Sequence, residues 1–236
     1  ELITPYVLRE QLDWFEDEIK FIRTLLQPGD VVLDIGANYG LYTLSMAKVV
    51  GKGGHVYAFE PASKTASYLT RSIAQNNFDQ ISLIRTALSN RSGVAEFGLN
   101  DNSELNSLDI SVASNGKTES VNLTTLDSFS GELSGRTIKF IKLDAEGEEG
   151  RILSGGDFFL KNYSPLIMFE LKHGSHINIA LIEQFRRIGY ALYRLIPGLN
   201  LLAPFSLSDP LDGYQLNLFA CKDDCSTQLT DAGKLV

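Results

Sequence analysis

Four acidic residues in this sequence each stand at the end of a short apolar run: Asp34, Glu60, Asp144 and Glu170. Apolar runs of this length and composition predict buried β-strands. In an open, mostly parallel sheet the carboxyl ends of the strands meet at one edge, where such sheets bind ligands. A carboxylate at that edge can accept hydrogen bonds from hydroxyl groups, pair with an ammonium group or act as a general base. The four side chains therefore predict one polar ligand site.

A glycine turn follows the first of these acids. Asp34 ends its strand, Gly36 and Gly40 come next, and the apolar residues of 41–47 then recur at helical spacing. A turn of this kind exposes backbone to a ligand and directs the N-terminus of the following helix at it. Glu60 lies about twenty residues past the glycines, where an acid suits the vicinal hydroxyls of a ribose. The first part of the chain therefore reads as a nucleoside-binding unit.

The elements that must position these residues alternate along the chain. Strands are predicted at 31–34, 55–60, 81–84, 137–144, 166–170, 190–196 and 214–221, and helices at 12–26, 41–50, 61–77 and 177–188. A further short helix is expected after the acidic turn 144–150, ending near Gly155 and Gly156. This βα alternation predicts an α/β fold, a mostly parallel sheet with helices on both faces. Segments 94–99 and 119–126 are expected to pair as an added β-hairpin. Segment 197–213 is expected to be a loop, and the lysines of the strand 137–144 suggest that it is partly wet.

Composition limits the class of protein. The 236 residues suit one domain, with a helical segment at 1–27 and a core at 28–221. A formal net charge of −8 argues against nucleic acid as a partner. No apolar run reaches the length of a membrane span, so no membrane partner is expected. Two cysteines, Cys221 and Cys225, predict free thiols and a cytoplasmic location.

Several motifs occur in the order that one family shows: DIGANYGLYT from Asp34, YAFEP around Glu60, TALSNRSG from Thr86, IKLDAEGEE around Asp144 and IMFEL around Glu170. This series resembles the FkbM family of S-adenosylmethionine-dependent methyltransferases. The resemblance covers about residues 31–170, and its most specific part is the run from Lys142 to Gly147. It implies a Rossmann-like class I methyltransferase fold, a seven-stranded sheet whose last strand is antiparallel.

The resemblance also implies roles for particular residues. S-adenosylmethionine would lie over Gly36, Asn38 and Gly40, beside Asp34. Glu60 would bind the ribose. Ala87, Leu88 and Ser89 would lie near the adenine. Asp144 would approach the methionine amine, the acceptor, or both. The acceptor would be a small molecule, a sugar or a secondary metabolite, methylated on a hydroxyl group.

Methyl transfer to an alcohol benefits from a general base, and the catalytic candidates are Asp144, Glu146, Glu170 and His173. Histidine has the pKa best suited to base catalysis near neutrality. The long polar segment 100–118 is expected to cover the acceptor, with Ser103, Asn106 and Ser107 able to bind it.

Other classes stay open at this point. A nicotinamide dehydrogenase shares the fold, although the glycine spacing and the run around Asp144 argue against it. An adenine-N6 nucleic-acid methyltransferase needs an Asn/Asp-Pro-Pro-aromatic run that is absent here. A metal-dependent O-methyltransferase could draw its ligands from Asp144, Glu146, Glu149 and Glu170. No metal is predicted, because acidic turns usually serve as hydrogen-bonded caps. A non-catalytic module that binds a nucleoside cofactor is the remaining alternative.

Overall fold

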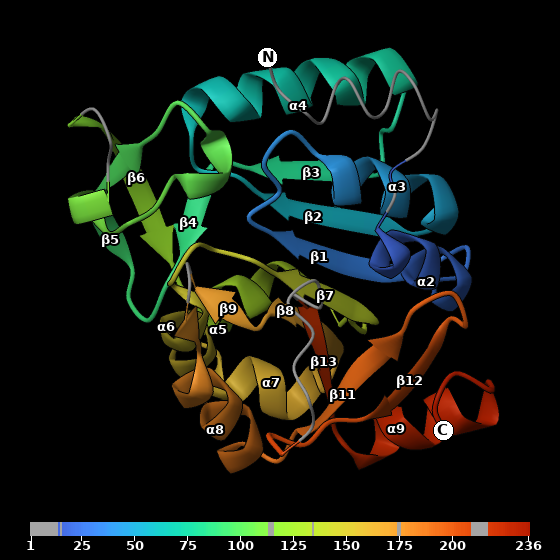
Figure 1. The fold of residues 1–236 in the computed structure, drawn as a ribbon. Helices are drawn as coiled ribbons and strands as arrows, with labels where there is room; N and C mark the ends of the chain where they lie inside the picture. Colours follow the sequence, from blue (N-terminus) through green and yellow to red (C-terminus); the bar gives the residue numbers. More distant parts are fainter. Residues whose placement is uncertain (1–13, 15, 113–115, 134, 174–175, 209–216) are drawn as a thin grey trace.

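A computed structural model describes residues 14, 16–112, 116–133, 135–173, 176–208 and 217–236. Its main sheet has eight strands in the order β12-β11-β13-β8-β7-β1-β2-β3 (Figure 1). Their bounds are β1 Val31–Ile35, β2 His55–Phe59, β3 Ile81–Ile84, β7 Phe140–Leu143, β8 Leu166–Glu170, β11 Ala191–Ile196, β12 Leu201–Pro204 and β13 Asn217–Cys221.

The direction of the strands agrees with the predicted sheet. Strands β3, β2, β1, β7 and β8 are parallel, so their carboxyl ends lie at one edge. Strand β13 is antiparallel to both of its neighbours, β8 and β11. The eighth strand, β12, pairs antiparallel with β11 in a segment that was predicted to be a loop. That part of the prediction is wrong: Leu202 is fully buried, and its carbonyl accepts a hydrogen bond from the amide of Val236 at 2.9 Å.

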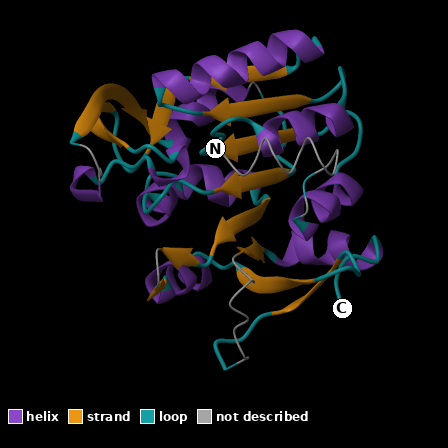
Figure 2. Cartoon of the chain, turned by 45° about the horizontal axis from the view of Figure 1, so that its top comes forward, coloured by secondary structure: helices purple, strands orange, loops and turns teal. Residues whose placement is uncertain are grey.

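Helices cover both faces of the sheet (Figure 2). Along β1, Val31, Leu33 and Ile35 contribute to one core, whereas Val32 contributes to the other, because successive side chains point to opposite faces. The helices are α2 Asp17–Leu25, α3 Leu41–Val50, α4 Ser63–Asn76, α5 Leu126–Phe129, α6 Glu149–Ser154, α7 Asp157–Tyr163, α8 Ile179–Arg187 and α9 Asp223–Asp231. The core containing Val32 includes residues of α2, α3 and α9, and the other core includes residues of α5, α6, α7 and α8.

The sequence did not predict helix α7. A single short helix was expected to end near Gly155 and Gly156. Instead α6 ends there and α7 follows at once. The amides of Phe158 and Phe159 donate to the carboxylate of Asp127, at 3.3 and 2.8 Å, which satisfies the first turn of α7 from a distant part of the chain. A cap supplied from thirty residues away leaves no local signal in the sequence.

A small second sheet projects from the carboxyl edge, at the left of Figure 1. The predicted hairpin is present as β5 (Gly93–Leu99) and β6 (Lys117–Thr124), and β4 (Thr86–Leu88) adds a third strand parallel to β6. Between β5 and β6 the chain forms two short 3-10 turns, η1 (Ser103–Leu105) and η2 (Ile110–Val112). A further 3-10 turn, η3 (Ser130–Leu133), follows α5, and β9 (Lys172–His173) pairs with β10 (His176–Ile177).

Two predictions from composition can be compared with the structure. Within the described ranges, no helix has both the length and the apolar character needed to cross a membrane. Cys221, at the end of β13, is buried, and Cys225, on α9, is partly exposed; neither forms a disulfide.

Candidate functional site

A cavity of about 480 Å³ opens at the carboxyl edge of the main sheet. Its wall includes the residues before α2, the turn after β1 with the start of α3, the ends of β2, β4 and β8, the turn after β7, the segment between β5 and β6, and the start of β13. The lining residues that the argument uses are Gly36, Asn38, Glu60, Ala87, Leu88, Lys142, Asp144, Glu146 and Glu170. Segments from across the whole chain therefore meet at the predicted ligand edge.

The glycine turn after β1 depends on two positions that only glycine can fill. Gly36 has a φ of +77°, and a Cβ atom there would lie 1.8 Å from the carbonyl oxygen of Asp144. Gly40 has a φ of +91°, and a Cβ atom there would lie 2.2 Å from a methyl carbon of Leu69. Positive φ and lack of space together require glycine. The turn consequently lies directly against the backbone of the acidic turn after β7.

Glu60 holds the same turn from the end of β2. Its Oε2 accepts a hydrogen bond from the amide of Asn38 at 2.8 Å, and its Oε1 accepts one from the amide of Ala62 at 2.9 Å. Burial raises the pKa of Glu60 to about 7, although both amides and Lys142 act in the opposite direction. Each carboxylate oxygen keeps a further lone pair at the cavity wall, which suits a pair of hydroxyl groups.

A buried network of charged side chains lies beneath the glycine turn after β1 and the acidic turn after β7. Asp34 is completely buried, accepts a hydrogen bond from the hydroxyl of Thr43 at 2.5 Å and lies 3.7 Å from the ammonium of Lys142. Lys142 was expected on a partly wet strand, and that expectation is wrong: it is 7% exposed. Its Nζ lies 3.0 Å from Asp144 Oδ2 and donates to the carbonyl of Gly36 at 2.9 Å. Burial acts to lower the pKa of Lys142, but Asp144 and Asp34 outweigh it, so the pKa is raised and the ammonium stays charged.

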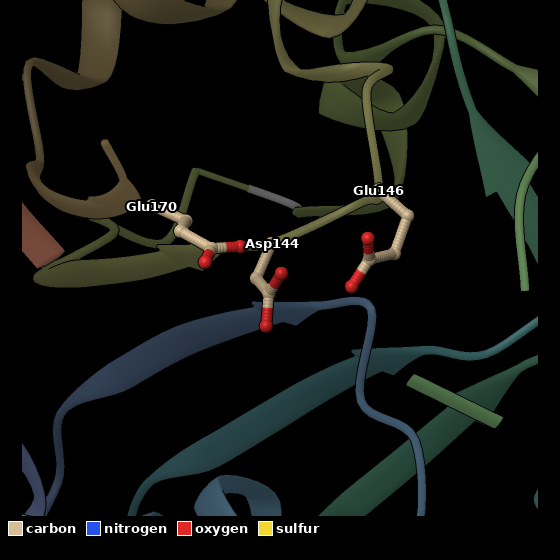
Figure 3. Close-up of side chains that lie close together, drawn as sticks. All are labelled: Asp144, Glu146 and Glu170. Carbon is tan, nitrogen blue, oxygen red and sulfur yellow. The ribbon is translucent and has the colours of Figure 1, made fainter. Parts of the chain in front are cut away.

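Three carboxylates converge at the cavity. Asp144 and Glu146 come from the turn after β7 and Glu170 from the end of β8, and one oxygen of each lies within 4.8 Å of the others (Figure 3). Burial, with the charges of Asp144 and Glu170, raises the pKa of Glu146 to about 8. Carboxylates packed this closely do not all ionise together near neutrality. Glu146 is therefore able to exchange a proton in the physiological pH range.

Glu148 and Glu149, which follow in the sequence, make hydrogen bonds within the protein. Glu149 Oε1 accepts hydrogen bonds from the amides of Ala145 and Gly147, at 2.8 and 3.3 Å, and so stabilises the acidic turn. Glu148 accepts a hydrogen bond from the hydroxyl of Ser89 at 2.8 Å and pairs with Arg151. Glu149 belongs to the predicted alternative metal set, but it stands outside the group of three converging carboxylates.

The segment between β5 and β6 closes one side of the cavity. The hydroxyl of Ser103 donates to Oδ1 of Asn38 at 2.9 Å, and the hydroxyl of Ser107 donates to the carbonyl of Glu146 at 2.8 Å. Asn106 uses its side-chain oxygen to accept from the amide of Asn100 at 2.7 Å. The three polar residues predicted to bind an acceptor thus make hydrogen bonds within the protein, and two of them link the segment to both site turns.

The remaining predicted residues fall into three groups. Ala87 and Leu88 line the cavity, together with the apolar side chains of Phe97 and Leu108. Asp34, Gly40 and Ser89 lie behind the wall and are not among its lining residues. The backbone of His173 belongs to β9, and its side chain lies outside what the structure describes.

Sequence reasoning missed part of the cavity wall. Tyr42 and Glu16 line it and are joined by a hydrogen bond of 2.5 Å from the tyrosine hydroxyl, and Trp14, Met168 and Asn217 also line it. Tyr42 and Met168 belong to two of the motifs, but the sequence assigned no role to them, and Glu16 was expected inside the helix predicted at 12–26.

The strand order, the glycine turn after β1 and the acid at the end of β2 define a Rossmann-like protein of the class I methyltransferase type. A family model described as the methyltransferase FkbM domain matches residues 34–192. The chain belongs to this family of S-adenosylmethionine-dependent methyltransferases. The predicted family, fold and cofactor are confirmed, and the dehydrogenase alternative is excluded.

Solved structures show the same fold. A methyltransferase FkbM from Methylobacillus flagellatus KT is 16% identical with a TM-score of 0.55, and the match covers 82% of this chain and 43% of that protein. An S-adenosylmethionine-dependent O-methyltransferase from Thermotoga maritima is 13% identical with a TM-score of 0.51, covering 89% and 66%. A putative rRNA methylase from Clostridium thermocellum is 12% identical with a TM-score of 0.50, covering 87% and 92%. The chain spans less than half the length of the M. flagellatus protein. None of the curated protein sequences compared with the chain matches it.

Proposed function

We propose that the chain transfers the methyl group of S-adenosylmethionine to a hydroxyl group of a small molecule, a sugar or a secondary metabolite. The observation that carries this proposal is the convergence of Asp144, Glu146 and Glu170 in the cavity that the glycine turn also lines. An alcohol loses its proton as it attacks a methyl group, so a carboxylate that titrates near neutrality is a suitable partner. One cavity therefore offers both a cofactor-binding turn and a proton acceptor.

The cofactor roles follow from which residues face the cavity. Glu60 accepts the ribose hydroxyls, and Ala87 and Leu88 lie against the adenine. Gly36 and Asn38 present backbone to the methionyl part, and Asp144 pairs with its ammonium group. Asp34, Gly40 and Ser89, which lie behind the wall, shape these turns without touching the cofactor.

Glu146 is the general base in this proposal. A lone pair of the acceptor oxygen attacks the methyl carbon, the carbon–sulfur bond breaks with its electrons passing to sulfur, and the hydroxyl proton passes to the Glu146 carboxylate. The products are the methyl ether and S-adenosylhomocysteine. Alignment of the reactants contributes up to about 7–11 kcal/mol, and a general base contributes a factor of about 10² to 10⁴.

The charged groups of the cavity favour an acceptor without negative charge. Glu16 and the three converging carboxylates line the cavity, and Lys142, the one lysine among its described lining residues, is already paired with two of the chain's own acids. A phosphate or a nucleic-acid backbone would be repelled by these groups and by the net charge of −8. No metal ion is needed for the proposed step, so EDTA should leave the activity unchanged.

The test is a methyl-transfer assay with labelled S-adenosylmethionine and a panel of hydroxylated small molecules. Glu146→Gln should lower the transfer rate about 10²-fold or more, whereas Glu119→Gln, which changes a carboxylate outside the cavity, should not. His173→Ala tests His173, the other candidate base. If Glu146 is the base, this variant should keep the transfer rate of the unmodified protein. Activity of Glu146→Gln that equals the unmodified protein would refute the assignment. Cofactor binding with no transfer to any acceptor would favour the non-catalytic module.

A further inference from the structure

The side chain of Lys142 connects the two turns that form the site. Lys142 lies on β7, between Asp34 on β1 and Met168 on β8 in the register of the sheet. Its ammonium donates to the carbonyl of Gly36 at 2.9 Å and lies 3.0 Å from Asp144 Oδ2. One buried cation therefore touches the turn after β1 and the turn after β7 at the same time.

The distances rank the partners of this ammonium. Asp34 is the more deeply buried acid, but its nearer oxygen is 3.7 Å from Nζ, beyond hydrogen-bond length. The two shortest contacts are to Gly36 and Asp144, which both line the cavity. The ring of Tyr42 lies below the ammonium, with its centroid 5.4 Å away. The ammonium is therefore bonded more closely to the two site turns than to Asp34 in the core.

Besides the contacts of Lys142 and the indirect link through Ser103 and Ser107, one backbone hydrogen bond joins the two turns within the described part of the chain. The amide of Asp144 donates to the carbonyl of Ile35 at 3.1 Å, which ends the pairing of β1 with β7. Beyond that bond, the carbonyl oxygen of Asp144 lies against Gly36 so closely that no side chain fits between them. A charge-assisted hydrogen bond to each turn holds this close approach.

We propose that Lys142 is a positioning residue of the methyltransferase site, which ties the carbonyl of Gly36 to the carboxylate of Asp144 and so fixes the cofactor-binding turn against the acidic turn. This inference rests on the proposed function. In this role Lys142 contributes to cofactor binding. A lysine that only neutralised the buried Asp34 would not do so. The ammonium also leaves the second oxygen of Asp144 available for the ammonium group of the cofactor.

The experiment compares Asp34→Asn with the double variant Asp34→Asn/Lys142→Met. Removing Lys142 alone would leave Asp34 as an uncompensated buried charge and destabilise the core. The double variant removes the buried charges of Asp34 and Lys142 together. Asp144 also loses its partner, but its side chain is 36% exposed, so its charge does not remain in the core. Lys139→Met is the matched control, because Lys139 precedes the same strand and donates to Gln228 at 3.3 Å, away from the cavity.

Two quantities are measured for each variant, under conditions in which the variants compared have equal thermal stability. The first is residue-resolved hydrogen exchange of the cofactor-free protein, read at the amide of Ala37, which donates to the carbonyl of Phe59, and at the amide of Ala145, which donates to Glu149. The second is the affinity for S-adenosylhomocysteine by calorimetry. Relative to Asp34→Asn, the double variant should show faster exchange at both amides and an affinity lower by about tenfold or more. Lys139→Met should change neither quantity.

The outcomes separate the two proposals. Equal affinity of Asp34→Asn and the double variant overturns the positioning role, whatever the exchange rates, because Lys142 would then only balance Asp34. Unchanged exchange at both amides overturns it as well, because the turns would not depend on the lysine. Failure of the unmodified protein to bind S-adenosylhomocysteine would refute the proposed function itself, and the exchange measurement would still decide whether Lys142 ties the turns.

Discussion

The affinity for S-adenosylhomocysteine should depend on pH through Glu60. The carboxylate of Glu60 already accepts hydrogen bonds from the amides of Asn38 and Ala62, and burial raises its pKa to about 7. Only the ionised form offers its remaining lone pairs to two ribose hydroxyls. The affinity should therefore be highest above pH 7 and fall as the pH is lowered through that value.

The size of the effect follows from the fraction of ionised Glu60. With a pKa of about 7, that fraction falls from nearly one at pH 8.5 to about 0.03 at pH 5.5, so the apparent affinity should fall about thirtyfold. In Glu60→Gln the amide nitrogen faces a backbone N–H group, and the charged hydrogen bonds to the ribose are lost. Such bonds are worth about 1.5–3 kcal/mol, so the affinity at pH 8.5 should fall about 10- to 150-fold.

Calorimetry between pH 5.5 and 8.5 tests both statements. Glu146 also titrates near this range, so the deciding quantity is the difference between the pH dependence of the unmodified protein and that of Glu60→Gln. Glu119→Gln is the control, because Glu119 also accepts a hydrogen bond from a backbone amide of the α4 region, that of Ser63, but lies outside the cavity. The reasoning is wrong if Glu60→Gln retains the full pH dependence, or if it binds as tightly as the unmodified protein.

Three further predictions concern the turns around the site. Gly36→Ala should lower the free energy of unfolding by about 2 kcal/mol or more and abolish cofactor binding, because its Cβ would collide with the carbonyl of Asp144; Gly53→Ala, which meets only ordinary contacts, should do neither in a urea denaturation series. Glu146 binds a proton more tightly in the folded protein, with a pKa of about 8 against an ordinary 4.5, so its contribution to stability should fall as the pH rises from about 4.5 to about 8. Urea denaturation at pH 6 and 8.5 should therefore show a smaller loss at high pH for Glu146→Gln than for the unmodified protein, and an equal loss would contradict the burial argument. Ser107→Ala removes the hydrogen bond to the Glu146 carbonyl, worth about 0.5–1.5 kcal/mol, and should slow methyl transfer about 2- to 10-fold with little change in S-adenosylhomocysteine affinity; unchanged transfer would show that this bond does not orient the base.

The glycine turn and its acid were predictable because their causes are local. The strand, the turn and the helix that contain Gly36 and Gly40 are adjacent in sequence, and both glycines have the positive φ that a residue without a side chain adopts readily. Glu60 could be placed because a strand of known length ends at the same edge as β1. The parallel direction of these strands and the helices on both faces of the sheet followed from the βα alternation, whereas the order of the strands came from the tertiary structure.

Elements whose stability comes from distant partners were not predictable in this way. Strand β12 forms because β11 presents an edge and the chain terminus covers Leu202, and α7 begins where Asp127 caps it. Ser103 and Ser107 were expected to face an acceptor. That expectation stays a prediction. The structure adds that both hydroxyls bond to turns from other parts of the chain, and the spacing of residues along the sequence does not indicate such contacts.

Lys142 illustrates both what the sequence determines and what depends on the tertiary structure. The sequence alone determined that a lysine lies two residues before Asp144 on a core strand, and alternation with apolar neighbours suggested that it reaches water. The tertiary structure decided otherwise, because β7 lies between β1 and β8 and is covered on both faces. In that position the ammonium is almost completely buried, and Asp34, Asp144 and the carbonyl of Gly36 stabilise its charge. Local pattern thus placed the residue, and the packing of remote strands determined its charge partners.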